Sequence, residues 1–248
     1  MIKKLDWRIW LALILVAASA MSYIIHYVIF RDIHHIFIYM IGDIAFMFIS
    51  VLVVTLFIER VLAQREKRVL INKLNMVIGT FFSEVGLQLM QKFSSFVSNS
   101  EELSGQLDIK PKWTDKEFLA ASEAARRFPY KIRVDRPALI DLQTFLSQKR
   151  DFLVRLLENP NLLEHERFTD LLWAVFHLSE ELSFRGDRIE NLPGVDYEHL
   201  GGDLKRAYSQ IASEWIAYTQ HLKNSYPFLF SLAARINPFR LTPTAIIG

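Results

Sequence analysis

The sequence of 248 residues contains no cysteine and little glycine or proline, with nine of the first and eight of the second. Without cysteine, the chain can form neither disulfides nor thiolate metal sites, and it has no cysteine nucleophile. The scarcity of glycine and proline favours long helices over a turn-rich β protein. The formal net charge is only +2, so the composition does not indicate nucleic-acid binding.

Several sequence motifs of enzymes are also missing. The sequence contains no Gly-x-Gly-x-x-Gly or P-loop motif for phosphate groups, no His-Glu-x-x-His zinc motif and no Gly-x-Ser-x-Gly nucleophile turn. We therefore expect neither an enzyme nor a bound cofactor.

Apolar residues make up 51% of the chain, and two long apolar runs lie near its N-terminus, at residues 9–30 and 36–58. Only His26 carries an ionisable group in the first run, and only Asp43 does so in the second. A helix of ~20 residues, rising ~1.5 Å per residue, spans the ~30 Å hydrocarbon core of a bilayer. Because only Arg31–His35 separates the runs, the sequence predicts an all-α integral membrane protein with a hairpin of two antiparallel transmembrane helices.

Basic residues flank both runs on the sides away from the connecting turn, which itself holds a single arginine. The positive-inside rule therefore predicts that both termini lie in the cytoplasm and that the turn lies outside. The expected location is the inner, cytoplasmic membrane, crossed twice. The flanking basic residues are Lys3, Lys4 and Arg8 before the first run, and Arg60, Arg65, Lys67, Arg68 and Lys73 after the second.

A cleaved signal peptide is the competing interpretation of the first run. Lys3, Lys4 and Arg8 resemble the basic start of such a peptide, and Ala18-Ser19-Ala20 resembles a cleavage site. The apolar run continues well past that site, to Phe30, which favours a membrane span.

The second span is predicted to continue as a cytoplasmic helix to about Phe96, because no proline occurs between Ile58 and Pro111. An apolar stripe at three- and four-residue steps indicates that this helix packs on another helix. The partner of the stripe stays open among the protein's own C-terminal domain, a second copy of the same helix and the membrane surface. The stripe consists of Leu70, Leu74, Val77, Phe81, Val85 and Leu89.

The remainder of the chain alternates helix signals with prolines and glycines, and we expect it to form an all-α domain. Thr114 and Glu117 form a capping box that opens one helix, and Asn159 is expected to cap a helix that ends at Gly186. The expected helices cover about residues 114–128, 137–158, 160–185 and 203–225, with a shorter one from residue 227, a polar linker over 98–112 and turns over 187–202. Six aromatic residues are expected in the core: Trp173, Phe176, Trp215, Tyr218, Phe228 and Phe230.

The expected divisions are a transmembrane hairpin (1–58), a juxtamembrane stalk (59–98), a linker with one helix (99–136) and a cytoplasmic helical domain (137–248).

Asp43 is the strongest functional candidate. A carboxylate inside a span costs ~2.5–3.5 kcal/mol on insertion scales, so it normally faces a cavity or a charged partner. In a symmetric assembly Asp43 would form a carboxylate ring, as in cation-selective pores, with Phe46 beneath it narrowing the path. The alternatives are an Asp43 carboxylate that pairs with His26 or Arg31 and fixes the hairpin, and a proton relay.

Three further groups of residues are weaker candidates. Around the outer turn, Arg31, Asp32, His34 and His35 could bind zinc, but the ligands are too few, and a polar interfacial turn is the simpler interpretation. The basic residues Arg60, Arg65, Lys67 and Arg68 could contact lipid headgroups. One predicted helix face carries Glu166, Asp170, His177 and Glu181, and the last helix carries Glu214 and His221. A di-metal site of that kind requires Glu-x-x-His pairs, which are missing, so we expect solvated or hydrogen-bonded helix faces and no metal.

The layout loosely resembles that of the mitochondrial calcium uniporter and its prokaryotic relatives, in which two spans enclose a short external turn and an acidic residue lies near the outer end of the second span. The local sequence here is Ile41-Gly42-Asp43-Ile44-Ala45-Phe46. It matches the uniporter signature Trp-Asp-Ile-Met-Glu-Pro only at Asp43 and Ile44, and lacks the second acid and the proline. The resemblance is one of architecture.

Two functional hypotheses follow. The first is a homo-oligomeric membrane protein that forms a cation pathway lined by Asp43. The alternative is a membrane-anchored scaffold or sensor whose cytoplasmic helical domain binds a partner protein. Both require the lipid bilayer, the first also requires further copies of the chain, and neither involves nucleic acid.

Overall fold

The structure, a computed structural model, describes residues 7–240 and 242–246. The described residues are 83% helical and contain no strand beyond a single antiparallel bridge between Val97 and Ile132. The all-α prediction is therefore confirmed. Lys3 and Lys4, which contribute to the predicted orientation, lie outside the described residues. Contacts divide the chain into two units, Met1–Lys67 and Arg68–Gly248.

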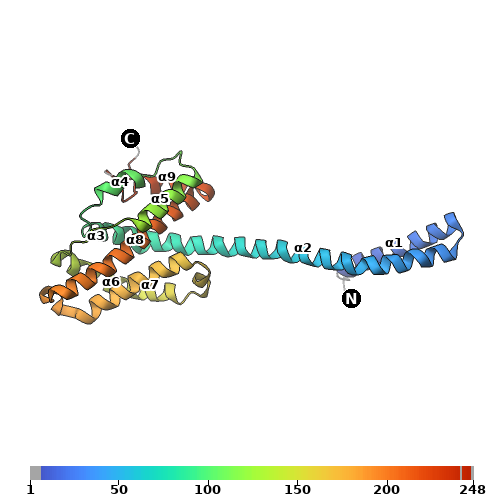
Figure 1. The fold of residues 1–248 in the computed structure, drawn as a ribbon, viewed down its shortest axis with the longest axis horizontal. Coiled ribbons are helices and arrows are strands. Elements are labelled where there is room, and N and C mark those ends of the chain that lie inside the picture. The colour runs from blue at the N-terminus through green and yellow to red at the C-terminus, as the bar shows by residue number, and fades with distance from the viewer. Residues whose placement is uncertain (1–6, 241, 247–248) are drawn as a thin grey trace, which may run out of the picture. The chain divides into compact units, whose positions relative to one another are not determined.

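The first unit contains helix α1 (Trp7–Phe30) and most of helix α2 (Ile33–Phe81), which run antiparallel (Figure 1). Arg31 closes α1 in the left-handed conformation, with φ +50° and its N–H donating to the carbonyl of Tyr27 at 2.8 Å. Asp32 then caps α2, since its Oδ1 accepts from the N–H groups of His34 at 2.9 Å and His35 at 3.3 Å. The two helices are thus joined by a turn of only two residues.

From Trp10 onward, the apolar side chains of α1 and of the first half of α2 are exposed, apart from Ile36 and Met40, which are partly buried. Two helical stretches, Trp10–Phe30 and Ile33–Ser94, are long and apolar enough to cross a membrane by length and composition, and none of the residues in their most apolar windows is buried. The structure therefore contains two candidate membrane spans at the positions that the sequence indicates.

The second unit is a bundle of helices around α8 (Gly194–Ser225), which contacts α3, α5, α7 and α9, while α6 packs on α7 (Figure 1). The end of α2 leads through a π-helical segment, Phe82–Gly86, into α3 (Leu87–Ser94). The other helices are α4 (Glu101–Leu107), α5 (Asp115–Arg127), α6 (Arg136–Leu157), α7 (Glu166–Arg185) and α9 (Pro227–Arg235), with short 3-10 helices at Pro160–Glu164 and Gly186–Asn191.

Most of the apolar stripe that begins on α2 is buried in the core of this helical domain, whereas two of its residues, Leu70 and Val77, are partly buried. Phe81 packs edge-on against Phe168 of α7 at 5.3 Å between ring centroids, and Phe82 packs against Trp215 of α8 at 5.2 Å. Such aromatic pairs contribute about 0.5–1.5 kcal/mol each beyond their buried area. Three partners were considered for the stripe, and in the structure it packs against the protein's own helical domain. Leu74, Ile78, Phe81, Phe82, Val85 and Leu89 are almost fully buried.

Several local signals act as the sequence predicts. Thr114 and Glu117 form the expected capping box at the start of α5. Gly186, with φ +51°, ends α7, and α9 starts at Pro227. Asn159 caps the 3-10 helix, however, and His165 caps α7.

Other boundaries differ from the prediction. The expected linker contains α4, and α8 starts at Gly194 rather than near residue 203, so Gly201 and Gly202 lie inside a helix. Buried neighbours on α8, such as Leu200 and Leu204, outweigh the helix penalty of about 1 kcal/mol for each glycine. Trp215 and Phe230 are core residues as predicted. Trp173 and Phe228 are not, being 57% and 72% exposed.

Candidate functional sites

The first candidate site is a pocket of about 340 Å³ in the hairpin, close to the turn, lined by both polar and apolar side chains. The imidazole rings of His26 on α1 and His35 on α2 stack at 5.8 Å, and Tyr39 packs edge-on against His35 at 4.6 Å. The contact between His26 and His35 connects the two helices near their joined ends, whereas His35 and Tyr39 both belong to α2. The pocket is lined by Tyr23, His26, Phe30, His35, Ile36, Tyr39 and Asp43.

Asp43 and His26 therefore lie on one pocket, as the sequence suggests, but they form no ion pair within the described part of the chain. Among the same residues, Nε2 of His26 is buried and has no hydrogen-bond partner. His26, His35 and Asp43 do not bring their ligand atoms within 4.8 Å of one another in the described chain. The pocket thus offers a carboxylate and an unpartnered imidazole to water or a cation, without a complete set of metal ligands.

The other sequence candidates of this unit lie outside the pocket. The Asp32 carboxylate serves as the cap of α2, and His34 is exposed next to it. Phe46 is exposed and does not line the pocket. The candidate headgroup residues Arg60, Arg65, Lys67 and Arg68 are exposed along α2.

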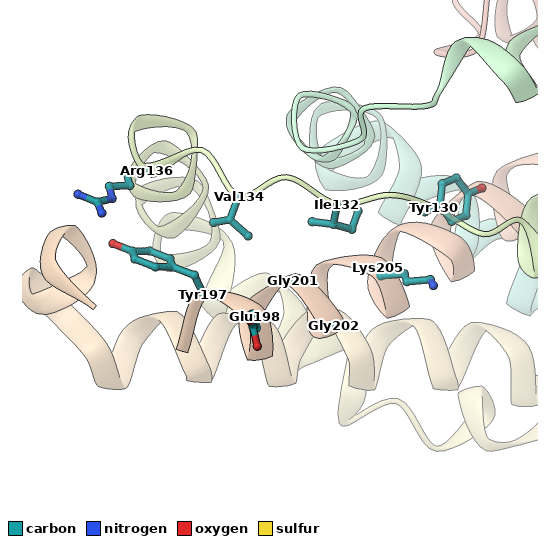
Figure 2. Close-up of a pocket in the computed structure, with 9 residues that line it drawn as sticks. All are labelled: Tyr130, Ile132, Val134, Arg136, Tyr197, Glu198, Gly201, Gly202 and Lys205. Atoms are coloured by element: carbon teal, nitrogen blue, oxygen red, sulfur yellow. The ribbon is translucent and has the colours of Figure 1, made fainter. Parts of the chain in front are cut away.

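A second pocket, of about 520 Å³, lies in the helical domain between the extended segment 130–134 and the first turns of α8 (Figure 2). Gly201 faces this segment, and a Cβ there would lie in ordinary van der Waals contact with Val134 at 3.7 Å and with Ile132 at 3.8 Å. At one end the guanidinium of Arg136 lies 5.3 Å from the ring centre of Tyr197. The rest of the lining is Tyr130, Glu198, Gly202 and Lys205. The sequence gives no signal for this pocket, because it forms only when segments distant in the chain pack together.

An apolar groove of about 560 Å³ lies between the end of α2, α8 and α9. His221 of α8 lies in it, with Nδ1 at 3.2 Å from the amide nitrogen of Asn75 on α2. Burial lowers the pKa of the His221 imidazole below its ordinary value. The imidazole is therefore held neutral as an internal hydrogen-bonding group.

Glu214, the other residue proposed from the last helix, lies on a different side of α8. Its carboxylate pairs with Nε of Arg167 on α7 at 2.9 Å. The Arg167 guanidinium also donates to the hydroxyl groups of Ser122 on α5, at 2.8 Å, and Ser213. Burial raises the pKa of the Glu214 carboxyl, and the positive charge of Arg167 opposes that rise. This network ties three helices together, and Glu214 and His221 do not form a common site.

The fold and the pockets define a class of two-part helical protein, in which an apolar helical hairpin precedes a helical domain with its own core. The family described as "Uncharacterized protein MJ1433, C-terminal helical domain" matches residues 70–235, and that described as "MJ1433, N-terminal helical domain" matches residues 3–62. The chain belongs to this MJ1433 family.

The uncharacterized protein MJ1433 of Methanocaldococcus jannaschii is 40% identical to the chain over 229 residues, which cover 92% of each protein. The two family matches fall on either side of the division between Lys67 and Arg68 that the contacts show. No solved structure matches the chain.

Proposed function

We propose that the chain is a membrane-anchored sensor or scaffold. In this proposal α1 and the first half of α2 form a hairpin in the cytoplasmic membrane, and the helical domain of residues 68–248 works on the cytoplasmic side. The observation that supports the anchor is the exposure of the apolar side chains along both helices. Soluble monomers rarely expose contiguous apolar patches above roughly a few hundred Å², and a lipid bilayer is the environment that such surfaces fit.

The proposed orientation is based on the basic residues after the second apolar run. The proposed role of the helical domain is based on how that domain packs. Basic residues that follow the second apolar run, such as Arg60 and Arg65, are exposed, and the positive-inside rule assigns their side to the cytoplasm. The helical domain has a buried core of its own, so it can present pockets to a partner or ligand while the hairpin holds it at the membrane.

The absence of cysteine from the sequence allows a direct test of this topology. We would introduce single cysteines at His34, in the hairpin turn, and at Lys112, in the helical domain, and label membrane vesicles of both orientations with a membrane-impermeant maleimide. The expected result is labelling of His34→Cys only from outside and of Lys112→Cys only from the cytoplasmic face. Release of the protein by alkaline carbonate, or labelling of both positions from one face, would contradict the anchor.

A homo-oligomeric cation pathway is the second candidate function. It is favoured by the position of Asp43 on the hairpin pocket with His26 and His35. Two helices cannot enclose a pore, so several copies would have to bring their Asp43 carboxylates to a common axis. Cation flux into liposomes that is lost in Asp43→Asn would support this function. Equal flux from the variant would exclude Asp43, and no flux from inserted wild-type protein would exclude the pathway itself.

A further inference from the structure

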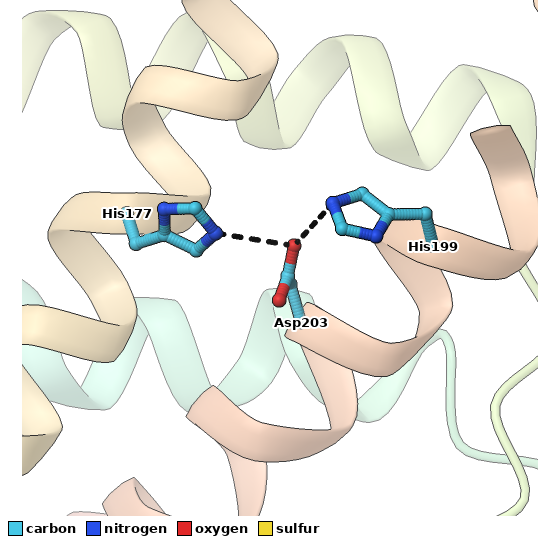
Figure 3. Close-up of side chains that lie close together, drawn as sticks. All are labelled: His177, His199 and Asp203. Atoms are coloured by element: carbon cyan, nitrogen blue, oxygen red, sulfur yellow. Dashed lines mark ion pairs between the residues drawn. The ribbon is translucent and has the colours of Figure 1, made fainter.

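Two histidines and an aspartate of the helical domain converge between α7 and α8 (Figure 3). His177 comes from α7, whereas His199 and Asp203 lie four residues apart on α8 and so share one face of that helix. Nε2 of His177 lies 3.6 Å from Oδ2 of Asp203, and Nε2 of His199 lies 3.4 Å from the same oxygen. The three ligand atoms all lie within 4.8 Å of one another.

The aspartate is the unusual member of this cluster. Its side chain is only 4% exposed, and within the described chain its Oδ2 makes no hydrogen bond. Oδ1 pairs with Arg206 at 3.3 Å, so the arginine leaves the other oxygen unsatisfied. A buried carboxylate oxygen without a hydrogen bond is costly, and the nearest groups to this one are the two imidazoles that face it in Figure 3. A cation between the three side chains would remove that cost.

The spacing of the atoms suits such a cation. Nitrogen and oxygen ligands lie about 2.0–2.2 Å from zinc in a tetrahedral site, which places neighbouring ligand atoms about 3.3–3.6 Å apart. The two distances to Asp203 are close to this range. The His177 and His199 side chains are 45% and 53% exposed, so they have room to adjust, and an ion can enter from solvent.

Glu181 supplies a fourth group. It lies one turn after His177 on α7, with Oε1 at 3.9 Å from Nε2 of His177 and Oε2 at 3.6 Å from Nε2 of His199. Its carboxylate is held by Arg185, which also pairs with Asp196 at 3.2 Å. Charged partners that orient carboxylates in this way commonly surround metal ligands.

We propose that His177, His199 and Asp203 bind one divalent transition-metal ion, with Glu181 or water completing the coordination. Two imidazole nitrogens and a carboxylate suit zinc and its neighbours, whereas Ca²⁺ and Mg²⁺ prefer oxygen ligands alone. The bound ion would connect α7 to α8. The site goes beyond the membrane anchor and does not depend on it.

The test is Zn²⁺ titration of the full chain, purified in detergent without a polyhistidine tag and freed of metal by a chelator. Binding is followed by calorimetry, and Co²⁺ is then substituted so that its visible absorption reports the geometry. We expect one ion per chain. His177→Gln and Asp203→Asn should each weaken binding by more than about 100-fold. Even the loss of a residue that only hydrogen-bonds to a metal ligand typically lowers the metal affinity about 10–100-fold. His221→Gln is the matched control, because it makes the same substitution at a histidine of α8 outside the cluster, and it should bind as the wild type does.

Thermal unfolding separates loss of a ligand from loss of the fold. Each variant should retain a cooperative transition without metal, and saturating Zn²⁺ should raise the transition temperature of the wild type and of His221→Gln only. If Asp203→Asn binds Zn²⁺ as the wild type does, or if the wild type binds none, the cluster is an ion-paired structural contact and the proposal is overturned. Neither result depends on whether the hairpin is inserted in a membrane.

Discussion

Gly79 and Tyr218 determine, at the scale of single residues, how closely the end of α2 approaches α8. A Cβ at position 79 would lie only 2.7 Å from the Tyr218 hydroxyl oxygen. The Tyr218 ring cannot easily retreat, because it stacks on Phe82 with 5.4 Å between centroids. Glycine is therefore required at position 79 by the contact between the two helices rather than by the backbone conformation.

Gly79→Ala should destabilise the helical domain by about 1 kcal/mol. The alanine gains about 1 kcal/mol in helix propensity, but overpacking costs about 1–3 kcal/mol. The matched control is Gly202→Ala in α8, where a new Cβ meets nothing within 4 Å; this variant should be more stable by up to about 1 kcal/mol. Urea unfolding followed by tryptophan fluorescence measures both, and a stabilised Gly79→Ala would show that α2 and α8 can separate without cost.

His221 makes the stability of the helical domain depend on pH. Burial lowers its pKa in the folded state, while the unfolded value stays near ~6.5. The unfolded state therefore binds the proton more readily, so the stabilising contribution is fully present above about pH 6.5 and is lost as the pH falls through the folded pKa. We expect the urea midpoint of the wild type to decrease when the pH is lowered from neutral to below about 6.

The His221→Gln variant isolates this effect from the other histidines. Glutamine can still bond with Asn75 but does not titrate, so its urea midpoint should change less over the same pH range. Identical pH profiles for the two proteins would show that the pKa of His221 is the same in the folded and unfolded states.

At the scale of helices, Arg167 and Glu214 connect α7 to α8 through a pair in which the carboxylate is buried and the guanidinium partly exposed. Removing one partner of such a pair leaves an uncompensated charge and costs about 3–5 kcal/mol when both partners are buried. Because Arg167 is partly exposed, Arg167→Met should destabilise the domain by an amount near the lower end of that range, about 3 kcal/mol. The decrease in the free energy of unfolding is measured by urea titration.

The double variant Arg167→Met, Glu214→Met is the control for this explanation. An apolar pair of similar volume needs no counter-charge, so it should recover much of the stability lost in Arg167→Met. If the double variant is as unstable as the single one, the lost contacts to Ser122 and Ser213 matter more than the buried charge.

The helices that the sequence predicts well are those with local signals. The Thr114 capping box and the Gly186 stop act through residues three or four positions apart, so the sequence alone suffices to place them. The helix α4 and the early start of α8 carry no such signal. They are stabilised by buried contacts such as those of Leu103 and Leu200, and a pattern along the chain does not show which partner will cover them.

The candidate metal site could not be predicted from the sequence for the same reason. The sequence places His177 and Glu181 on one helix face, and the His199–Asp203 spacing of four residues is a second signal of the same kind that could have been recognised. Without the packing of α7 on α8, the two pairs have no reason to be considered together. The expectation of a solvated or hydrogen-bonded face does not include the contact between this face and His199 and Asp203 of α8.

At the scale of the whole molecule, the domain boundary does not coincide with the end of the apolar run. The residues from Arg68 onward belong to the helical unit, and those from Leu74 to Phe96 contribute some of its most deeply buried side chains. The segment that the sequence presents as a stalk between membrane and domain is therefore largely a core element of the domain.

Two truncations test this boundary. Residues 68–248 should fold alone, with high helical circular dichroism and a cooperative thermal transition, because they retain the whole core of the unit. Residues 99–248 should not, because they lack Leu74, Phe81, Val85 and Leu89, and each buried large side chain that is removed costs about 2–5 kcal/mol. These four side chains alone amount to about 8–20 kcal/mol, comparable to the whole stability of a native domain, about 5–15 kcal/mol. Ile78, Phe82, Met90 and Phe93, which are buried as deeply, are lost with them. A cooperative transition in residues 99–248 would mean that the end of α2 only covers a core that is complete without it.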